Sequence, residues 1–431
     1  MKKFLALILA LVMALSLVAC GGGNDTPSTD DNNNAEGAKV KVGFITLHDE
    51  NSTYDLNFIN GAKEAIAALG LTEDDYILKT NVPEGQECYE AAVDMVDKGC
   101  NIIFADSFGH EPYMIQAAQE FPEVQFCHST GTRAHTEGLA NYHNAFASIY
   151  EGRYLAGIAA GLKLNEMIEN GTEINGTKVT AENAKIGYVG AFTYAEVVSG
   201  YTSFYLGAKS VCPTVTMDVT FTGSWYDETL EKEGAVKLIQ GGCKLISQHA
   251  DSLGAPTACE KAGVPNVSYN GSTVSTCPNT YIISSRINWA PYYEMCIKAV
   301  MDGTEIPADW TGTLATNSVV LSDLNTAVAA EGTAEAIAAA TEKLEKGELH
   351  VFDCSTFTTK VDDKVNTFKA DYLKLDEAGH ITSYMADVDT DQAYTGDTEV
   401  VHDGYFSESE FRSAPYFDLQ IDGINLLDTK M

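Results

Sequence analysis

The sequence predicts an α/β protein with two lobes, each built on a parallel sheet. From residue 40 onward, short strand-like runs alternate with helix-like segments, which is typical of βαβ units. The alternation pauses at a Gly- and Thr-rich connector, residues 170–183, and then starts again. A chain of 431 residues that is 45% hydrophobic and 20% charged can form two cores.

The N-terminus has the pattern of an export signal. Met1, Lys2 and Lys3 precede an apolar run at 4–18, and the run closes at Cys20. We interpret residues 1–19 as a signal peptide. The cut site resembles the lipobox of bacterial lipoproteins, which implies that Cys20 is diacylated; the alternative is a plain secretory signal with an incidental cysteine. The polar composition of residues 20–38 predicts a flexible tether.

The first array of elements begins at residue 40. Alternating and amphipathic patterns predict strands at 40–47, 76–81, 101–105 and 124–128, with helices at 60–69, 88–98 and 113–120. A polar loop at 48–55 separates the first strand from the first helix.

The second array begins with a helix at 151–164, whose alanines and glycines suit close packing. Strands follow at 185–189, 215–221, 244–248, 266–269 and 281–285, with helices at 194–208, 230–240 and 256–262. The remaining sequence predicts helices at 289–301 and 334–346, an edge strand at 318–321 and a strand at 349–352. An acidic, polar insertion of low helical content is expected near 361–401.

Charge and cysteine spacing exclude several functions. Signal removal takes away two basic residues and no acidic one, so the net charge passes from −34 to −36. Such a field disfavours nucleic acid and anionic lipid surfaces, and it makes phosphorylated ligands unfavourable. Nine cysteines besides Cys20 lack Cys-x-x-Cys or metal-site spacing, so we expect buried free thiols and no metal or cofactor.

The segment 221–227 is the feature around which a binding site is expected. A strand ends there at a Gly-Ser break, and Trp225 and Tyr226 lie on the loop before the next helix. Ligands of open α/β sheets bind outside the carboxyl ends of the strands, so this aromatic pair can stack on a flat molecule. The alternative is that both rings cap a core.

Several sequence blocks occur in order along the chain: YLAGIAAG (154–161), TGSWYD (222–227), INWAPYY (287–293) and YF (405–406) with SAPYF (413–417). Together they resemble the basic membrane protein family, which are substrate-binding lipoproteins of ABC importers. The resemblance implies a type I periplasmic-binding protein fold with a ligand cleft between two Rossmann-like lobes. Characterised members bind purine nucleosides, and the branch with the Gly-Ser-Trp block is closer to purine-base binders.

The resemblance also implies three crossings between lobes, near Ala145, near Arg286 and within 318–354. We therefore expect lobe 1 at 39–145, lobe 2 at 146–285, a return to lobe 1 at 286–345, and a C-terminal segment at 346–431 that joins lobe 2.

Candidate ligand-binding residues follow the ends of the expected strands. Asn51, Tyr54 and Asp55 lie on the first loop, although Asp55 could instead cap a helix. Ser107 and Phe108 follow another strand, and Phe108 could form a sandwich with Trp225 around a heterocycle. Asp251 and Asn270 could read a purine edge. Trp289 could contact ligand or pack at a hinge, and His249 is interpreted as structural.

The expected function is an extracytoplasmic lipoprotein, anchored to the cell membrane, that binds a purine base or nucleoside and delivers it to an ABC permease. A ligand-sensing surface receptor is the first alternative. A nucleoside-processing α/β enzyme is the second, and it is disfavoured because the sequence has no nucleophile elbow, phosphate-binding glycine loop or deaminase zinc signature. No catalytic residue is assigned.

Overall fold

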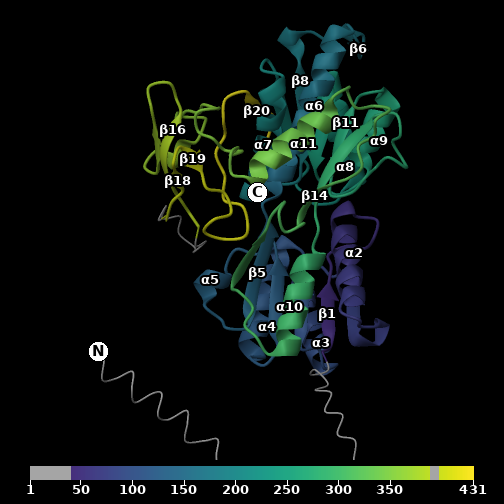
Figure 1. Ribbon diagram of the computed structural model, residues 1–431, viewed down its shortest axis with the longest axis vertical. Helices are drawn as coiled ribbons and strands as arrows, with labels where there is room; N and C mark the ends of the chain where they lie inside the picture. The colour runs from purple at the N-terminus through teal and green to yellow at the C-terminus, as the bar shows by residue number, and fades with distance from the viewer. Residues whose placement is uncertain (1–39, 389–397) are drawn as a thin grey trace, which may run out of the picture. The chain divides into compact units, whose positions relative to one another are not determined.

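The computed structural model describes residues 40–388 and 398–431, which contain two large sheets flanked by helices (Figure 1). The predicted α/β class is confirmed. The signal peptide, Cys20 and the tether lie outside the described residues.

The first sheet is entirely parallel, in the order β13-β5-β4-β3-β1-β2. Its strands are β1 (Val42–Ile45), β2 (Tyr76–Lys79), β3 (Ile102–Ala105), β4 (Gln125–Ser129), β5 (Tyr142–Ala147) and β13 (Asp309–Gly312). Its helices are α2 (Thr53–Ala68), α3 (Gln86–Asp97), α4 (Glu111–Glu120), α5 (Ala134–Glu137) and α10 (Ala290–Asp302). Helix α2 starts earlier than expected because the Ser52 hydroxyl accepts from the Asp55 amide and caps it.

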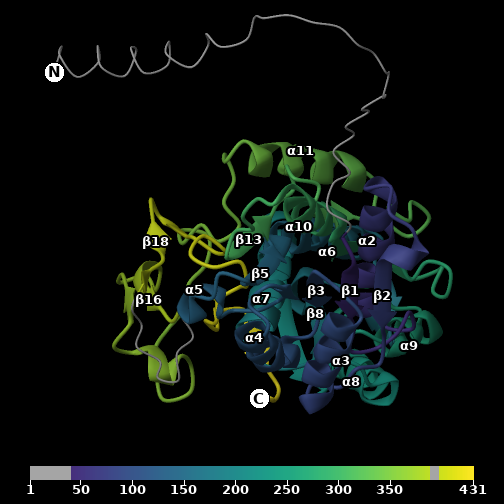
Figure 2. The ribbon, with the colours of Figure 1, turned by 90° about the horizontal axis from the view of Figure 1, so that it is seen from below.

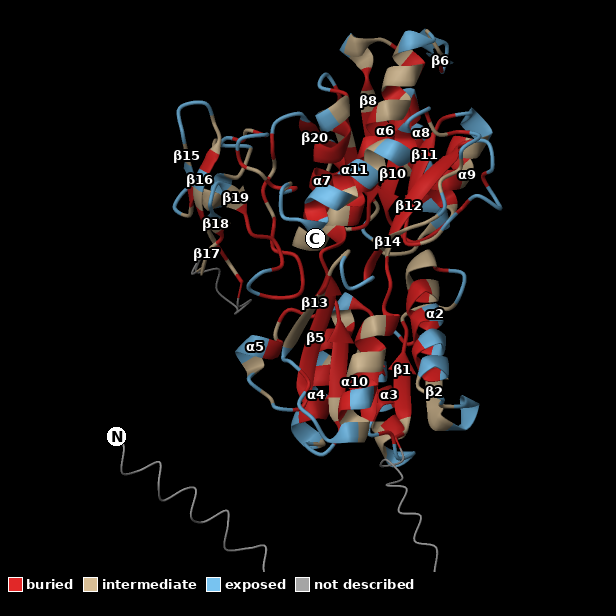
Figure 3. Ribbon diagram, viewed as in Figure 1, coloured by how far each residue is buried: buried red, intermediate tan, exposed pale blue. Residues whose placement is uncertain are grey.

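The second sheet has the order β14-β12-β11-β10-β8-β9-β20, with only β14 antiparallel. Its strands are β8 (Lys185–Gly190), β9 (Thr216–Phe221), β10 (Leu245–His249), β11 (Asn266–Tyr269), β12 (Tyr281–Ile287), β14 (Val319–Leu321) and β20 (Ile424–Leu426). Its helices are α6 (Ile149–Glu169), α7 (Ala195–Val211), α8 (Glu228–Gln240), α9 (Gly254–Ala262) and α11 (Thr333–Glu345). The strands are buried while most flanking helices expose one face (Figure 3).

Close packing between α6 and α7 depends on glycine. A Cβ at Gly157 would lie 2.1 Å from the Phe204 carbonyl oxygen, and one at Gly207 would lie 2.0 Å from the Tyr154 carbonyl oxygen. Both distances are far below van der Waals contact, so the two backbones can approach this closely only without side chains. The small residues of 151–164 therefore have the packing role that the sequence predicted.

The chain passes between the sheets after β5, after β12 and between β13 and β14. Residues 286–345 were expected to return to lobe 1, but part of this segment lies with the second sheet. Strand β14 pairs with β12, and Ala340 and Leu344 of α11 belong to the core of the second sheet. Only α10 and β13 of that segment lie with the first sheet.

The C-terminal segment adds small sheets beside the second lobe. They are β15 (Leu373–Leu375), β16 (Ile381–Ala386) and β17 (Thr398–Glu399), and the pair β18 (Val401–His402) and β19 (Tyr405–Phe406). Figures 1 and 2 both place β16 and β18 on the side of the molecule where α5 lies, away from α2 and α3. A further hairpin, β6 (Glu173–Ile174) and β7 (Thr177–Lys178), occupies the connector.

The strand predicted at 349–352 is wrong. Those residues form no strand, and only Asp353 makes an isolated bridge, to Tyr405. The apolar character of the run has another cause, because the Phe352 ring stacks on Phe417 with centroids 4.5 Å apart.

All nine cysteines in the described part of the chain are buried and unpaired, as the scattered spacing predicted. Across residues 40–388 and 398–431, no helix has both the length and the apolar character needed to cross a membrane.

Candidate functional site

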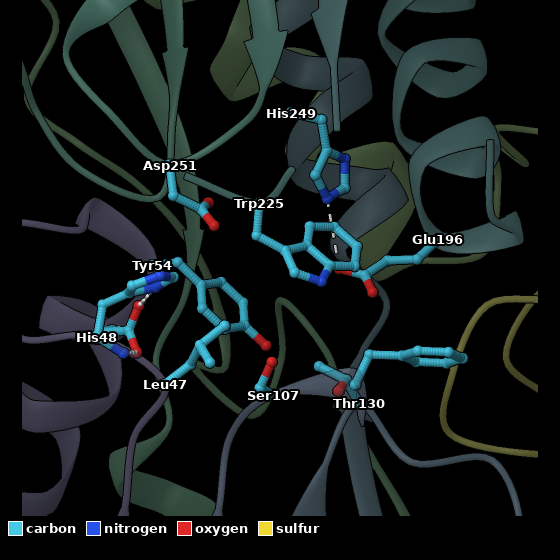
Figure 4. Close-up of a pocket in the computed structure, with 11 residues that line it drawn as sticks. Leu47, His48, Tyr54, Ser107, Thr130, Glu196, Trp225, His249 and Asp251 are labelled. Atoms are coloured by element: carbon cyan, nitrogen blue, oxygen red, sulfur yellow. Dashed lines mark hydrogen bonds and ion pairs between the residues drawn. The ribbon is translucent and has the colours of Figure 1, made fainter. Parts of the chain in front are cut away.

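A pocket lies where the carboxyl ends of strands from both sheets face each other (Figure 4). The empty space between its side chains and at its mouth is about 340 Å³. The room inside for the centre of a water-sized sphere is only about 10 Å³, so the pocket is nearly closed in this structure, and a ligand the size of a purine requires the two lobes to move apart. The lining residues are Leu47, His48, Tyr54, Asp55, Ser107, Phe108, Thr130, Glu196, Trp225, His249 and Asp251.

Six of the predicted ligand-binding residues line this pocket. Tyr54, Asp55, Ser107 and Phe108 come from the first lobe, and Trp225 and Asp251 come from the second. They converge because parallel strands present their carboxyl ends at one edge of a sheet, and the two edges face each other.

Asp251 presents a buried carboxylate at one end of the pocket, and Figure 4 shows it directed into the space. Its side chain is 4% exposed. Burial raises the pKa of Asp251 well above its usual value, and the nearby Asp55, Glu231 and Glu196 add to the rise. Its backbone carbonyl accepts from the Thr53 amide at 3.1 Å and so joins the two lobes.

Asp55 has a mainly structural role in the pocket wall. Its Oδ1 accepts from the His48 amide at 2.7 Å, and its Oδ2 accepts from the Ser52 hydroxyl at 2.5 Å. Burial alone would raise the pKa of Asp55, but hydrogen bonds from His48 and Ser52 outweigh it and the pKa is lowered. Most of its acceptor capacity is therefore already used to hold the loop after β1.

Tyr54 forms part of the same wall. Its hydroxyl donates to the Asp106 carbonyl oxygen at 2.7 Å, and its ring meets Phe58 edge to face at 4.8 Å. The ring is therefore fixed in place without a ligand, which suits a preformed site.

The aromatic residues form a connected series across the lobes. Phe192 meets the Trp225 ring edge to face at 5.1 Å and stacks on Tyr194 at 5.1 Å. Tyr194 in turn stacks on Phe108 of the first lobe at 5.3 Å. Trp225 therefore has support on one side while the pocket lies on another, as a stacking platform requires.

Three predicted residues lie elsewhere. Asn51 is exposed and its amide group donates to Asp49 at 2.8 Å. Asn270 is buried in a turn with φ +64°, where its backbone amide donates to Ser285 at 2.9 Å. Trp289 is 1% exposed and stacks on Phe58 at 4.4 Å, so its ring belongs to the first core.

Sequence reasoning did not select five of the lining residues: Leu47, His48, Thr130, Glu196 and His249. Leu47, His48, Thr130 and His249 end or directly follow strands, so the rule used for Phe108 could have found them. Glu196 is the second residue of α7, and its Oε1 lies 3.3 Å from His249 Nε2. Burial lowers the pKa of His249, so this ring is neutral near neutral pH.

The described residues that line the pocket include three carboxylates and no lysine or arginine. Carboxylates only accept hydrogen bonds when ionised. The arrangement can therefore bind a flat ligand that donates hydrogen bonds, and it is unsuited to a phosphate group.

A sequence-family model described as ABC transporter substrate-binding protein PnrA-like, Bmp, matches residues 44–351. The purine-binding protein BAB2_0673 of Brucella abortus is 32% identical over 269 residues, which cover 62% of this chain and 70% of that protein. A putative ABC transporter glucose-binding protein, TsgA13 of Haloferax volcanii, is 32% identical over 264 residues. These residues cover 61% of this chain and 62% of the Haloferax protein. Among solved structures, an ABC transporter solute-binding protein from Aeropyrum pernix K1 superimposes with a TM-score of 0.59 at 18% identity, covering 75% of this chain and 94% of its own.

Proposed function

The chain belongs to the Bmp family of PnrA-like ABC transporter substrate-binding proteins, and from this we propose that it binds a purine base or purine nucleoside in the pocket between its lobes. One observation carries the ligand class: an indole platform, Trp225, lies in the same small pocket as the carboxyl group of Asp251, which can accept hydrogen bonds from a ligand. A purine offers both a flat π face and N–H donors on its edge.

The names of the relatives agree on an ABC transporter binding protein but not on its ligand. One is named for purines and another, at the same identity, for glucose. The pocket chemistry favours the purine, because a purine presents a flat π face to the indole and its N–H donors lie on one edge.

Calorimetry with the full chain tests the ligand class. We expect saturable, one-to-one binding of at least one of adenine, hypoxanthine, adenosine, inosine and guanosine, and weaker binding of the monophosphates because the pocket is acidic. Glucose and amino acids serve as controls. Binding of glucose without any purine would refute the ligand class, and conversion of the ligand during incubation would favour the enzyme alternative.

We further propose that Cys20 carries a lipid anchor on the extracytoplasmic face of the membrane and that the protein delivers its ligand to an ABC permease. The apolar run before Cys20 and the polar tether after it support the anchor. A sensing receptor would share these features but would not be required for uptake, so loss of purine uptake on deletion of the gene favours delivery.

Mass spectrometry tests the anchor. In the native host, the mature N-terminal peptide is expected to begin at Cys20 and to carry the mass of acyl chains. The Cys20→Ala variant is expected to lose the acyl mass and to appear in the soluble fraction. An unacylated Cys20 in the wild-type protein would refute the anchor while leaving ligand binding unaffected.

A further inference from the structure

A fully buried arginine lies directly behind the wall of the pocket. Arg153, near the start of α6, is 0% exposed. Its Nη2 donates to the Tyr188 hydroxyl and, at 3.3 Å, to the backbone carbonyl oxygen of Gln248. The next residue of β10 is His249, which lines the pocket. The arginine therefore contacts a strand that supplies a pocket side chain, although it does not line the pocket itself.

Aromatic rings surround the guanidinium group. Its central carbon lies 4.5 Å from the centre of the Tyr269 ring, 5.3 Å from that of Tyr188 and 5.5 Å from that of Phe204. These are cation–π distances, and such contacts stabilise a desolvated cation. The centre of the Tyr269 ring also lies 4.6 Å from that of His249. One tyrosine therefore contacts both the arginine and the pocket histidine.

The hydrogen bonds of this guanidinium are incomplete for a buried charge. Its Nε and Nη1 atoms have no partner in the part of the chain that the structure describes. Both partners of Nη2 are uncharged, because one is a carbonyl oxygen and burial raises the pKa of Tyr188 to about 12. Burying a charge with unpaired donors is unfavourable for stability. The position of Arg153 is better explained by the effect of its charge on neighbouring groups.

His249 is the pocket residue closest to this charge along the contacts described. Its Nε2 lies 3.3 Å from Glu196 Oε1, so the neutral ring carries its proton on Nε2 and donates to the carboxylate (Figure 4). Its Nδ1 is buried without a partner in the described structure, and a Cβ at Gly200 would lie 2.8 Å from it. Burial lowers the pKa of His249 and the charge of Arg153 lowers it further, against the opposite effect of Glu196.

The groups that face this ring come from several elements of the second lobe. Arg153 lies on α6, Glu196 on α7, Tyr188 on β8 and Tyr269 on β11, and Asp251 follows β10. Burial raises the pKa of both tyrosines, so their phenols are neutral. The groups of this set that can carry charge are therefore the arginine and the two carboxyl groups. Because all of them belong to one lobe, the network does not depend on how far apart the two lobes are.

We propose that Arg153 is a positioning residue for the site: its buried charge keeps His249 neutral, and the neutral ring donates to Glu196 without cancelling the charge of that carboxylate. The proposal rests on the proposed function of the pocket. A protonated His249 would form an ion pair with Glu196 and neutralise one of the acceptors that the N–H donors of a ligand meet. Arg153 acts through His249, because it does not line the pocket.

NMR of the ligand-free protein, labelled on histidine, tests the first step. The chain has nine histidines, so His249→Gln is used to identify the signal of His249. In the wild-type protein this ring is expected to stay neutral, with the proton on Nε2, from about pH 8 to about pH 5.5. Arg153→Met keeps an apolar side chain among the same rings and removes the charge. Its His249 titration midpoint is expected to rise by at least about one pH unit.

Calorimetry with adenosine tests the second step. Arg153→Met is expected to bind adenosine within about three-fold of the wild-type value near pH 8, and to lose at least about ten-fold more affinity than the wild-type protein as the pH is lowered to about 6. The unfolding temperature is expected to stay the same or rise, because a buried charge with unpaired donors is removed. An arginine with a purely structural role would lower the unfolding temperature and would reduce affinity equally at every pH.

Two further variants separate charge from shape. Arg153→Lys keeps the positive charge and is expected to leave the His249 midpoint at its wild-type value. Arg153→Gln lacks the charge but can still donate to the Gln248 carbonyl, and it replaces the methionine variant if that protein does not fold. Lys209→Met is the matched control, because it removes one positive charge and a cation–π contact with Tyr205, at 5.7 Å, from the far end of α7. This control is expected to leave the midpoint and the pH profile unchanged.

The outcomes separate the inference from the function. An unchanged His249 midpoint in the neutral Arg153 variants, or an equal rise in Lys209→Met, refutes the role of Arg153 whether or not any purine binds. A raised midpoint with an unchanged pH profile of adenosine affinity refutes the positioning role, because Glu196 is then not an acceptor for the ligand. If the midpoint rises but no purine binds the wild-type protein, the proposed function fails while the link between Arg153 and His249 stands.

Discussion

Replacing Asp251 by asparagine is expected to weaken purine binding by about 2–3 kcal/mol, roughly 30- to 150-fold. The carboxylate is buried and directed into the pocket, and among the described residues no side chain is found donating to it. A ligand N–H would therefore make a charge-assisted hydrogen bond that an amide only partly replaces. Calorimetry with the preferred purine measures the loss.

The same carboxylate predicts how affinity depends on pH. Burial and neighbouring carboxylates raise the pKa of Asp251 in the free protein, whereas ligand donors favour the ionised form. Binding then releases a proton, so affinity is expected to fall as the pH is lowered through that raised pKa. Asp251→Asn is expected to remove this dependence.

Asp227→Asn is the matched control for both measurements. Asp227 caps α8 by accepting from the Thr229 and Leu230 amides at 3.0 and 2.9 Å, and asparagine caps helices equally well. The Asp227→Asn substitution removes one negative charge from a loop next to the pocket and is expected to leave purine affinity within about two-fold of the wild-type value. An equal loss in both variants would show that overall charge, and not a contact from Asp251, determines binding.

Local pattern was enough to predict most of the sheet strands, because β1, β3, β8 and β10 are apolar runs between turn residues. Strand β5 was missed because Tyr142–Ala147 contains His143 and Asn144. Both side chains are buried because other segments satisfy them: the His143 ring bonds Gln125 and Pro307 at 2.8 and 3.1 Å, and Asn144 Oδ1 accepts from the Ala134 amide at 2.6 Å. No local pattern contains that information.

The prediction of site residues was limited in the same way, because local pattern carries no information on long-range contacts. Residues that follow an evident strand, such as Phe108 and Asp251, could be selected because topology alone brings them to the cleft. Asn270 also follows a strand, yet its left-handed turn and its bond to Ser285 keep it out of the lining. Glu196 lies in the first turn of α7, so only the tertiary packing of that helix beside His249 brings it into the lining.

Trp225→Ala is expected to weaken the preferred purine by about 1–3 kcal/mol, the usual contribution of one aromatic face to base stacking. The indole lines the pocket and is supported by Phe192 at 5.1 Å, so its position does not depend on the ligand. Trp225→Phe keeps a smaller π face and is expected to lose less than half as much free energy. Ligand titrations followed by calorimetry give the affinities of all three proteins.

Stability measurements on the same variants separate stacking from packing. Trp225 is only partly buried against the second core, so the alanine variant is expected to stay folded, with a modest fall in the free energy of unfolding. If Trp225 stacks on the base, purine affinity is expected to fall from the wild-type protein to Trp225→Phe and again to Trp225→Ala, in the order of the π surface at this position. If Trp225→Ala keeps wild-type affinity for every purine that binds, the indole serves the core of the second lobe and the base must stack elsewhere, with Tyr54 and Phe108 the remaining benzene rings in the lining.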